Sequence, residues 1–319
     1  MTDNDEFLRL ADPMRRELLA HCYRMTGSVH DAEDLVQETY LRAWNAYDKF
    51  DGRASLRTWL YKIATNTCLT ALDSRKRRPM PTGLGAPSAD PSAELESSKE
   101  VPWLEPIPDS MVDDPASVVA GRSSLRLALM AALQHLPPRQ RAVLVLREVL
   151  QWKAAEVAEV LGTTTTAVNS MLQRAKAQLE QVGLKEEDLA EPTAQERKEL
   201  LDRYVAAFED YDIAAIVELF TKDAVWEMPP FLGWYQGPEN IGRLIANWCP
   251  AKRPGDLKLV PVSANGQAAF GMYFRGEAFA IPVLTLSGGK VSHVSQFFDL
   301  SLFEVFGLPR RLPEATPVQ

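Results

Sequence analysis

The chain has 319 residues, enough for two domains and a small third, and its hydrophobic fraction of 46% is sufficient for buried cores. Its formal net charge of −8 would, taken alone, argue against a nucleic-acid-binding protein. The N-terminus from Met1 to Glu6 is polar and acidic, and no apolar run approaches the roughly 18 residues of a membrane span. We therefore expect a cytoplasmic protein with neither a signal peptide nor a membrane segment.

The three cysteines, Cys22, Cys68 and Cys249, are far apart and form no CxxC or His-Cys cluster. This spacing indicates a reducing compartment and small buried thiols. We expect no structural metal, no catalytic metal and no cofactor.

The charge is unevenly distributed along the chain. Residues 79–120 carry 1 basic and 8 acidic side chains, whereas residues 121–185 carry 9 basic and 4 acidic ones. Phosphate contacts require local rather than overall positive charge, so the segment 121–185 remains a candidate for nucleic-acid binding.

The first block, residues 5–78, is predicted to be helical. Ser28 to Asp31 resembles a capping box, and the helix that follows has a buried stripe at 3–4 spacing. That stripe consists of Ala32, Leu35, Val36, Thr39, Tyr40, Ala43 and Trp44. The opposite, largely acidic face contains Asp31, Asp34, Gln37, Glu38 and Arg42. Such a face is usually only solvated, and a partner surface is the alternative.

A second helix is predicted from Ser55, with Leu56, Leu60, Ile63 and Ala64 on its core side. Another face has a different composition, and it leads into a run of four cations that ends at Pro79. It consists of Trp59, Lys62, Asn66, Asp73, Arg75, Lys76, Arg77 and Arg78. An aromatic ring and an amide among cations suit single-stranded or melted DNA, because the ring stacks on a base while the cations follow the backbone. The alternative is a helix that simply ends with cations at its negative dipole end.

Residues 79–115 are predicted to be an acidic linker rich in proline and serine, without helical or strand periodicity. Trp103, Leu104, Glu105 and Pro106 form a stiff, partly apolar motif within it. An exposed apolar motif in an acidic linker usually docks on another surface, either in the same chain or on a partner.

Residues 116–182 are predicted to contain a leading helix and a helix-turn-helix. Pro137-Pro138 opens one helix, a short helix runs from Ala154 to Leu161, and Gly162 ends it before a longer helix capped by Thr163 or Thr164. Ala158, Gly162 and Val168 suit a steep crossing of the last two helices. The polar face of the longer helix is typical of major-groove readers, and a solvated helical hairpin is the alternative. Residues 180–194 are predicted to form an acidic hinge with Gly183 and Pro192.

The last block, residues 195–305, is predicted to be α+β. A helix is expected over 195–220, a short strand over 224–228 and another helix over 238–249. Strands are expected at about 257–264, 267–275, 278–286 and 290–300, with turns at Asn265-Gly266 and Ser287 to Gly289. Residues 306–319 are proline-rich and are predicted to be disordered.

Taken together, these motifs resemble a bacterial RNA polymerase sigma factor of the extracytoplasmic-function group, in the sigma-70 family. The match covers residues 5–78 (region 2) and 116–182 (region 4), and residues 195–305 resemble a SnoaL-like, nuclear transport factor 2-like cone. The implied fold is multidomain, with two all-α sigma domains followed by an α+β cone. The linker motif also resembles that of the sigma factors that carry such an extension.

The resemblance implies the function and three sets of site residues. The protein would bind core RNA polymerase at its β′ clamp and β flap and direct it to promoter DNA, without being an enzyme. The polymerase-binding residues would be Asp31, Asp34, Leu35, Gln37, Glu38 and Arg42. The −10 element would be melted and read by Phe50, Arg53, Ser55, Trp59, Lys62, Asn66, Arg75, Lys76, Arg77 and Arg78. The −35 element would be read by Thr164, Thr165, Thr166, Asn169, Ser170, Gln173, Arg174 and Lys176.

The resemblance further implies that the C-terminal domain modulates activity through intramolecular contacts with the linker, at Trp103 to Pro106, or with the sigma domains. A separate anti-sigma factor is not required. The main alternative is a helix-turn-helix regulator with a ligand-sensing C-terminal domain. A third hypothesis is a SnoaL-type enzyme, whose acid/base groups would come from Asp223, Glu227, His293 and Asp299.

Overall fold

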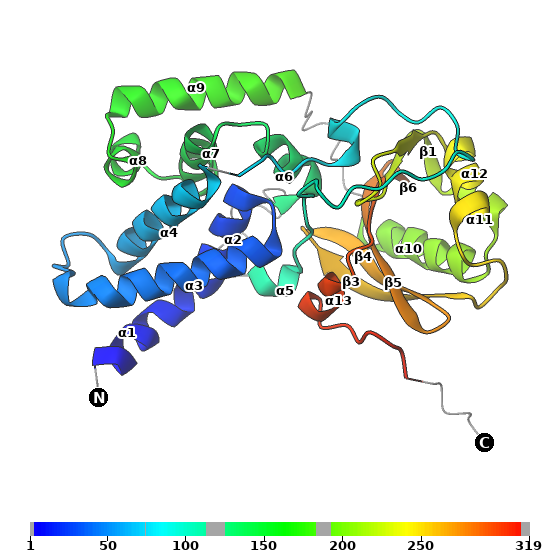
Figure 1. Cartoon of the computed structure of the whole chain (residues 1–319), viewed down its shortest axis with the longest axis horizontal. Helices are drawn as coiled ribbons and strands as arrows, with labels where there is room; N and C mark the ends of the chain where they lie inside the picture. The colour runs from blue at the N-terminus through cyan, green and yellow to red at the C-terminus, as the bar shows by residue number, and fades with distance from the viewer. Residues whose placement is uncertain (1–2, 74, 113–124, 183–192, 314–319) are drawn as a thin grey trace. The chain divides into compact units, whose positions relative to one another are not determined.

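A computed structural model describes residues 3–73, 75–112, 125–182 and 193–313, and the chain forms two compact units (Figure 1). The first unit consists of Met1–Arg78 and Leu104–Leu184, and the second consists of Pro79–Trp103 and Lys185–Gln319. The polypeptide thus passes from the first unit to the second, returns at Leu104, and leaves again after residue 184.

The first unit begins with an N-terminal helical group. Its helices are α1 (Asp3–Ala11), α2 (Arg15–Thr26), α3 (Val29–Ala46) and α4 (Leu56–Leu72). The predicted serine caps are confirmed: Ser28 Oγ accepts the amide of Asp31 at 3.1 Å, and Ser55 Oγ accepts that of Thr58 at 3.0 Å. These side chains satisfy amides that have no partner within the helix, which fixes where α3 and α4 begin.

A second helical group completes the first unit. It comprises α6 (Leu127–Leu133), α7 (Pro138–Leu144) with a π-helical extension (Val145–Val149), α8 (Ala154–Leu161) and α9 (Thr165–Val182), and the short α5 (Asp109–Val112) precedes it. Gly162 has a φ of +58°, which allows the tight turn between α8 and α9, and Thr164 Oγ1 accepts the amide of Ala167 at 3.2 Å. The predicted helix-turn-helix is therefore confirmed.

The second unit is a strongly curved sheet covered by helices. Its helices are α10 (Ala194–Glu209), α11 (Ile213–Glu218), α12 (Pro238–Trp248) and α13 (Ser301–Val305). Its strands are β1 (Phe220–Glu227), β2 (Trp234–Gln236), β3 (Leu257–Ala264), β4 (Gln267–Phe274), β5 (Glu277–Ser287) and β6 (Lys290–Phe297). The strand order is β2-β1-β6-β5-β4-β3, antiparallel except for the parallel pair β1 and β6. This is the predicted α+β cone.

The linker segment Pro79–Trp103 runs along the second unit. The amide of Ser88 donates to Trp234 O at 2.7 Å, and the indole of Trp234 donates to Gly85 O at 2.9 Å. Further along, the indole of Trp248 donates to Pro91 O at 3.2 Å, and Ser97 forms a β-bridge with Phe231. The segment is irregular in conformation but is hydrogen-bonded along most of its length, which its composition did not reveal.

Two predictions for the C-terminal block were wrong in detail. The helix predicted over 195–220 is two helices, because Tyr211 has a φ of +52° and Asp212 caps α11 by accepting the amide of Ala215 at 3.0 Å. Disorder predicted from residue 306 does not apply to 306–313: Tyr273 Oη donates to Pro309 O at 2.9 Å, and Arg311 bridges to Glu277.

Some predicted segments fall outside the described residues. These are part of the leading helix (residues 116–124), the hinge at 183–192 and the end of the tail at 314–319. In the described ranges, the helices are all too short or too polar to cross a lipid bilayer.

Candidate nucleic-acid and polymerase interfaces

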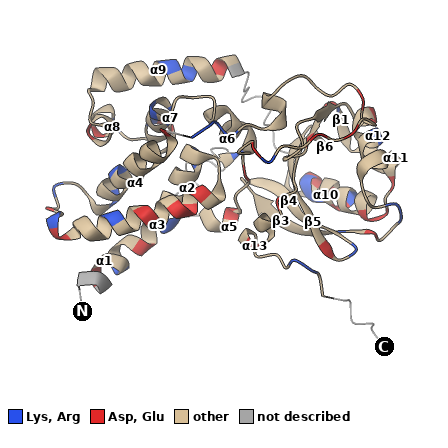
Figure 2. Cartoon of the chain, in the orientation of Figure 1, with Lys and Arg blue, Asp and Glu red and all other residues tan. Residues whose placement is uncertain are grey.

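The exposed face of α3 is partly as predicted. Asp34, Gln37 and Arg42 are exposed, and Arg42 pairs with Glu38 at 2.7 Å across one helical turn. Figure 2 shows several acidic residues along α3. Leu35 is a correction to the predicted polymerase-binding set, because it is only 8% exposed and belongs to the buried stripe of α3. A residue buried in the helical core supports the face but does not contact a partner.

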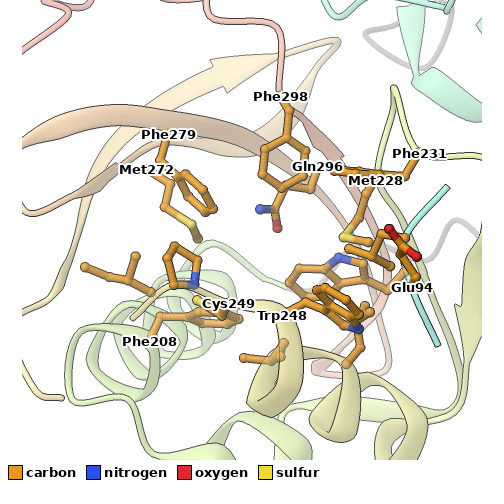
Figure 3. Close-up of a pocket in the computed structure, with 16 residues that line it drawn as sticks. Glu94, Phe208, Met228, Phe231, Trp248, Cys249, Met272, Phe279, Gln296 and Phe298 are labelled. Carbon is orange, nitrogen blue, oxygen red and sulfur yellow. The ribbon is translucent and has the colours of Figure 1, made fainter. Parts of the chain in front are cut away.

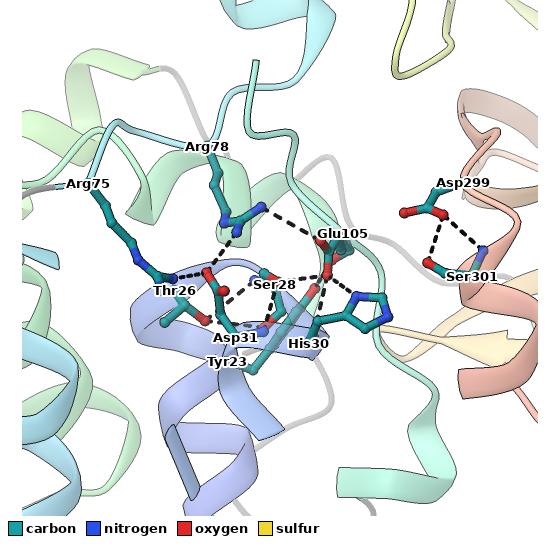
Figure 4. A network of polar contacts seen from close by, with 10 residues as sticks. All are labelled: Tyr23, Thr26, Ser28, His30, Asp31, Arg75, Arg78, Glu105, Asp299 and Ser301. Atoms are coloured by element: carbon teal, nitrogen blue, oxygen red, sulfur yellow. Dashed lines mark hydrogen bonds and ion pairs between the residues drawn. The ribbon is translucent and has the colours of Figure 1, made fainter. Parts of the chain in front are cut away.

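Asp31, also predicted to face the polymerase, is instead engaged within the first unit (Figure 4). Its Oδ2 accepts a hydrogen bond from Arg78 at 2.7 Å and another from Arg75. Burial opposes ionisation of this carboxyl, but the two guanidinium groups outweigh that effect and lower the pKa of Asp31 below its ordinary value. Two cations of the four-residue run Arg75 to Arg78, which was predicted to bind DNA, are therefore held by Asp31 of α3.

Glu105 of the linker motif joins the same network (Figure 4). Its carboxylate accepts Ser28 Oγ at 2.7 Å, contacts His30 Nδ1 at 3.0 Å and lies 3.6 Å from an Arg78 nitrogen. Its backbone is fixed as well, because the amide donates to Gly27 O at 2.9 Å and the carbonyl accepts Tyr23 Oη at 2.7 Å. A carboxylate at the N-terminus of α3 also interacts favourably with the helix dipole.

The four residues of the linker motif divide between the two units. Leu104 is fully buried in the first unit beside Gly27, where an added Cβ would lie 2.8 Å from Leu104 Cδ1. Trp103 belongs to the second unit, where its indole donates to Ser98 O at 3.0 Å. Pro106 is buried. The motif docks within the chain and marks the point where the polypeptide returns to the first unit.

The predicted −10 face on α4 is also partly engaged. Phe50 and Trp59 pack on each other with ring centroids 4.9 Å apart, and the Ser55 side chain caps α4. Lys62 pairs with Glu159 of α8 at 3.8 Å, and Arg77 contacts His135 at 2.9 Å. Arg53, Asn66 and Lys76 are exposed.

The second helical group packs against α4 through α7 and α8, and the Lys62–Glu159 pair lies at the border between that contact and the predicted −10 face. The ring of Trp152 meets that of Tyr61 edge-on at 5.4 Å. Arg141 of α7 is 4% exposed and donates to Met25 O of α2, while its other bonds reach Gln134 Oε1 at 2.9 Å and Leu136 O at 3.1 Å. Arg141 was not among the residues predicted from the sequence to be functional. Its position in an otherwise apolar helix face would have indicated a buried cation with specific partners.

The predicted −35 face on α9 is the most accessible of the three sets. The seven residues from Thr164 to Arg174 that were predicted to read DNA are all exposed. Lys176 is half-buried and pairs with Glu148 at 3.0 Å. The buried side of the helix is apolar, with Val168, Leu172 and Ala175 facing the core, so the polar face is presented outward.

In the second unit, Glu227 and His293 of the proposed acid/base groups contact each other, but none of the four proposed groups lines the cavity of the cone. Glu227 is buried and contacts His293 Nε2 at 2.7 Å, and it accepts Ser295 Oγ at 3.0 Å and the amide of Thr82 at 3.1 Å. Burial alone would raise the pKa of Glu227, but His293 and the hydrogen bonds lower it. Asp299 accepts from Ser301 at the start of α13. Glu227 thus holds the linker, and these groups do not line the cavity of the cone.

Comparison with known proteins agrees with this architecture. Residues 10–78 match sigma-70 region 2, residues 126–179 match sigma-70 region 4, and residues 201–299 match a SnoaL-like domain. The ECF RNA polymerase sigma factor SigG of Mycobacterium tuberculosis is 60% identical over 314 residues, which are 96% of this chain and 85% of that protein. The chain belongs to the extracytoplasmic-function (ECF) family of RNA polymerase sigma factors.

A second relative shows that the three-part organisation recurs. The ECF sigma factor SigJ of Mycobacterium tuberculosis is 31% identical over 304 residues, 88% of each chain. The crystal structure of SigJ is similar with a TM-score of 0.63 at 25% identity, covering 96% of this chain and all of that one. The N-terminal helical group is thus region 2, the second group is region 4, and the second unit carries the SnoaL-like extension.

Membership of the family decides the main functional question. ECF sigma factors bind core RNA polymerase and direct it to promoters, and this chain carries both of the regions that perform that task. The presence of region 2 separates it from a helix-turn-helix regulator that would act without polymerase. The family consists of non-enzymatic regulators.

Proposed function

We propose that this sigma factor rests in a closed state in which region 4 covers part of the DNA-binding face of region 2. The observation that carries the proposal is the packing of α7 and α8 on α4, the helix assigned to the −10 element. Lys62 and Arg77, which would follow the DNA backbone, are paired with Glu159 and His135 of region 4. Opening would release these cations and allow the two regions to reach separate promoter elements.

In the open state, the exposed residues of α9 would read the −35 element in the major groove, and Phe50, Trp59 and the cations from Arg75 to Arg78 would handle the melted −10 strand. Asp34, Gln37 and Glu38 on α3 would dock on the β′ clamp, and region 4 would contact the β flap. The exposure of Asp34 and Gln37 supports the first docking assignment, and Leu35 supports that face from the core.

The linker would connect the SnoaL-like domain to this equilibrium. Arg78 and Glu105, which flank the linker in sequence, lie 3.6 Å apart in region 2, so Pro79–Trp103 forms a loop whose two ends meet at one place. The body of that loop is held by the second unit through Glu227, Trp234 and Trp248. A change in how the second unit holds the loop would therefore act on Arg78 and Asp31, at the −10 face.

A reversible cross-link tests the closed state directly. In a Cys249→Ser background, Lys62→Cys combined with Glu159→Cys replaces a 3.8 Å ion pair with two thiols that a short thiol-reactive, cleavable cross-linker can join. With core polymerase and a promoter that carries both elements, the cross-linked protein should initiate poorly, and cleavage of the cross-link should restore initiation. Each single cysteine variant, treated identically, is the control.

If the cross-linked protein initiates as well as the cleaved one, the closed state is not inhibitory and the proposal fails. Loss of initiation on treatment of a single variant would instead report damage by the reagent, and the untreated Lys62→Cys protein shows how much initiation depends on the Lys62 side chain itself. Measuring core binding separately shows whether closure blocks polymerase docking or only promoter reading.

A further inference from the structure

The cone of the SnoaL-like domain encloses a cavity of about 500 Å³ that promoter recognition does not use (Figure 3). Its walls are largely aromatic and aliphatic and include Phe208, Trp226, Met272 and Phe279. A concave apolar space of this size, bounded by a few polar groups, is typical of small-molecule sites.

Two polar atoms in the cavity wall have no hydrogen-bond partner in the described part of the chain. They are Trp226 Nε1, a donor, and Gln296 Oε1, an acceptor, on side chains of residues that are 2% and 5% exposed. In Figure 3 the amide of Gln296 points into the cavity. Because buried polar groups are nearly always paired, these two atoms indicate a bound molecule that supplies an acceptor and a donor.

The charge of the lining restricts the chemistry of that molecule. Among the described residues that line the cavity, Glu94 is the one with a full charge, and it is exposed. The lining has no lysine, arginine or histidine to balance an anion. Transfer of a carboxylate or phosphate into this space would be costly, so the lining selects a neutral molecule.

One wall of the cavity is supplied by the linker rather than by the cone. Leu95 is half-buried against the core of the second unit, and Glu94 precedes it. The neighbouring residues fix this wall, since the amide of Leu232 donates to Glu96 O at 2.9 Å and Ser97 bridges to Phe231, which also lines the cavity. An occupant would therefore touch the linker loop as well as the cone.

We propose that this cavity binds a neutral, mainly apolar molecule that carries a hydroxyl group, with the hydroxyl donating to Gln296 Oε1 and Leu95 closing the site. A hydroxyl suits this lining because it both donates and accepts, so it matches Gln296 or Trp226. The binding site itself does not depend on the closed state of the sigma regions. Only its effect on transcription would pass through the linker.

The test uses two probes of nearly equal size on the full-length protein. 2-Naphthol has a hydroxyl and naphthalene lacks it, and binding of each is followed by isothermal titration calorimetry. We expect saturable binding of both, with 2-naphthol about tenfold tighter because it pairs a buried acceptor. Gln296→Leu should remove most of that difference while leaving naphthalene binding within about twofold.

Leu95→Ala should weaken both probes about fivefold, since it removes part of the apolar wall. Leu300→Ala is the matched control, because Leu300 is an exposed leucine of the same unit that does not line the cavity, and it should change neither affinity. Absence of saturable binding of either probe to the wild-type protein would overturn the proposal, as would equal affinities for the two probes. The comparison of the two probes uses the wild-type protein, so it does not depend on the folding of any variant. A negative result would not bear on promoter-directed transcription or on the closed state.

Discussion

Replacing Arg141 with methionine should open the sigma regions of this protein. Arg141→Met keeps an unbranched side chain of similar length but removes the guanidinium. Of the hydrogen bonds that Arg141 makes, those to Gln134 and Leu136 stay within region 4, and the one to Met25 O crosses to region 2. The variant therefore removes one crossing bond and leaves the buried carbonyl of Met25 without that donor.

The size of the effect follows from the kind of bond that is lost. A charge-assisted hydrogen bond between buried groups contributes about 1.5–3 kcal/mol, so closure should weaken by about 2 kcal/mol. That difference raises the ratio of open to closed molecules roughly thirtyfold. Burial lowers the pKa of Arg141 to about 10, so the guanidinium is charged at neutral pH and the estimate applies there.

Energy transfer between two dyes measures the opening. In a Cys249→Ser background, Leu41→Cys on α3 and Ala177→Cys on α9 place both labels at exposed positions, while Cys22 and Cys68 remain buried and unlabelled. We expect lower transfer efficiency in Arg141→Met than in the parent protein. Arg139→Met is the matched control, because Arg139 donates to Leu161 O at 2.8 Å within region 4 and should not affect the distance between the regions.

Unchanged transfer in a folded Arg141→Met variant would show that the bond to Met25 does not hold region 4 against region 2. Equal opening of the protein by Arg139→Met would show that the effect comes from disturbing region 4 rather than from the bond to Met25. Circular dichroism of both variants shows whether region 4 keeps its helices.

Three further outcomes are expected. Arg174→Ala should weaken binding of polymerase holoenzyme to −35 DNA and flatten its salt dependence by about one phosphate contact, measured by filter binding from low to high salt. Glu105→Ala should lower the free energy of unfolding of the first unit by about 2 kcal/mol and Glu105→Gln by about half as much, whereas Glu100→Ala, an exposed change in the same linker, should have no effect in urea titrations. His21 is buried, and burial together with the charge of Arg24 lowers its pKa to about 3. As the pH drops below about 6.5, protons therefore bind the unfolded chain before the folded one, and the free energy of unfolding should fall by up to about 1.4 kcal/mol per pH unit. His21→Gln should remove that part of the pH dependence.

Signals that act over a few residues predicted much of the first unit. Ser28 and Ser55 cap helices because their hydroxyls reach amides three residues ahead, and Gly162 turns the chain because it adopts a positive φ without strain. The alternation of the C-terminal strands and their glycine turns likewise predicted the antiparallel part of the sheet. The parallel pairing of β1 with β6 joins residues about seventy positions apart, for example Trp226 with Val294, and local alternation carries no information about it.

The predicted roles of site residues were wrong where a side chain pairs with a residue that is distant in sequence. Asp31 lies on the exposed side of the helical wheel of α3, which made it a candidate for docking on the polymerase. In the structure, however, its carboxylate accepts hydrogen bonds from Arg75 and Arg78, which follow α4 in the sequence. The same physics limits prediction of the linker, whose hydrogen bonds are made mainly by its backbone. Thr82 and Ser88 donate backbone amides to Glu227 and Trp234, and backbone groups leave no trace in composition.

The position of Glu105 suggests why a linker motif would be coupled to DNA binding in this chain. Glu105 shares Arg78 with Asp31, and it also accepts from Ser28, the cap of α3, the helix that we propose docks on the polymerase. Weakening its hold would remove one of the carboxylates that hold Arg78, which favours transfer of that cation to a DNA phosphate. Glu227 holds the loop between Arg78 and Glu105 at Thr82, and Leu95 of the same loop lines the cavity. A molecule in the cone would therefore act on a cation of region 2 through the loop, without touching the DNA.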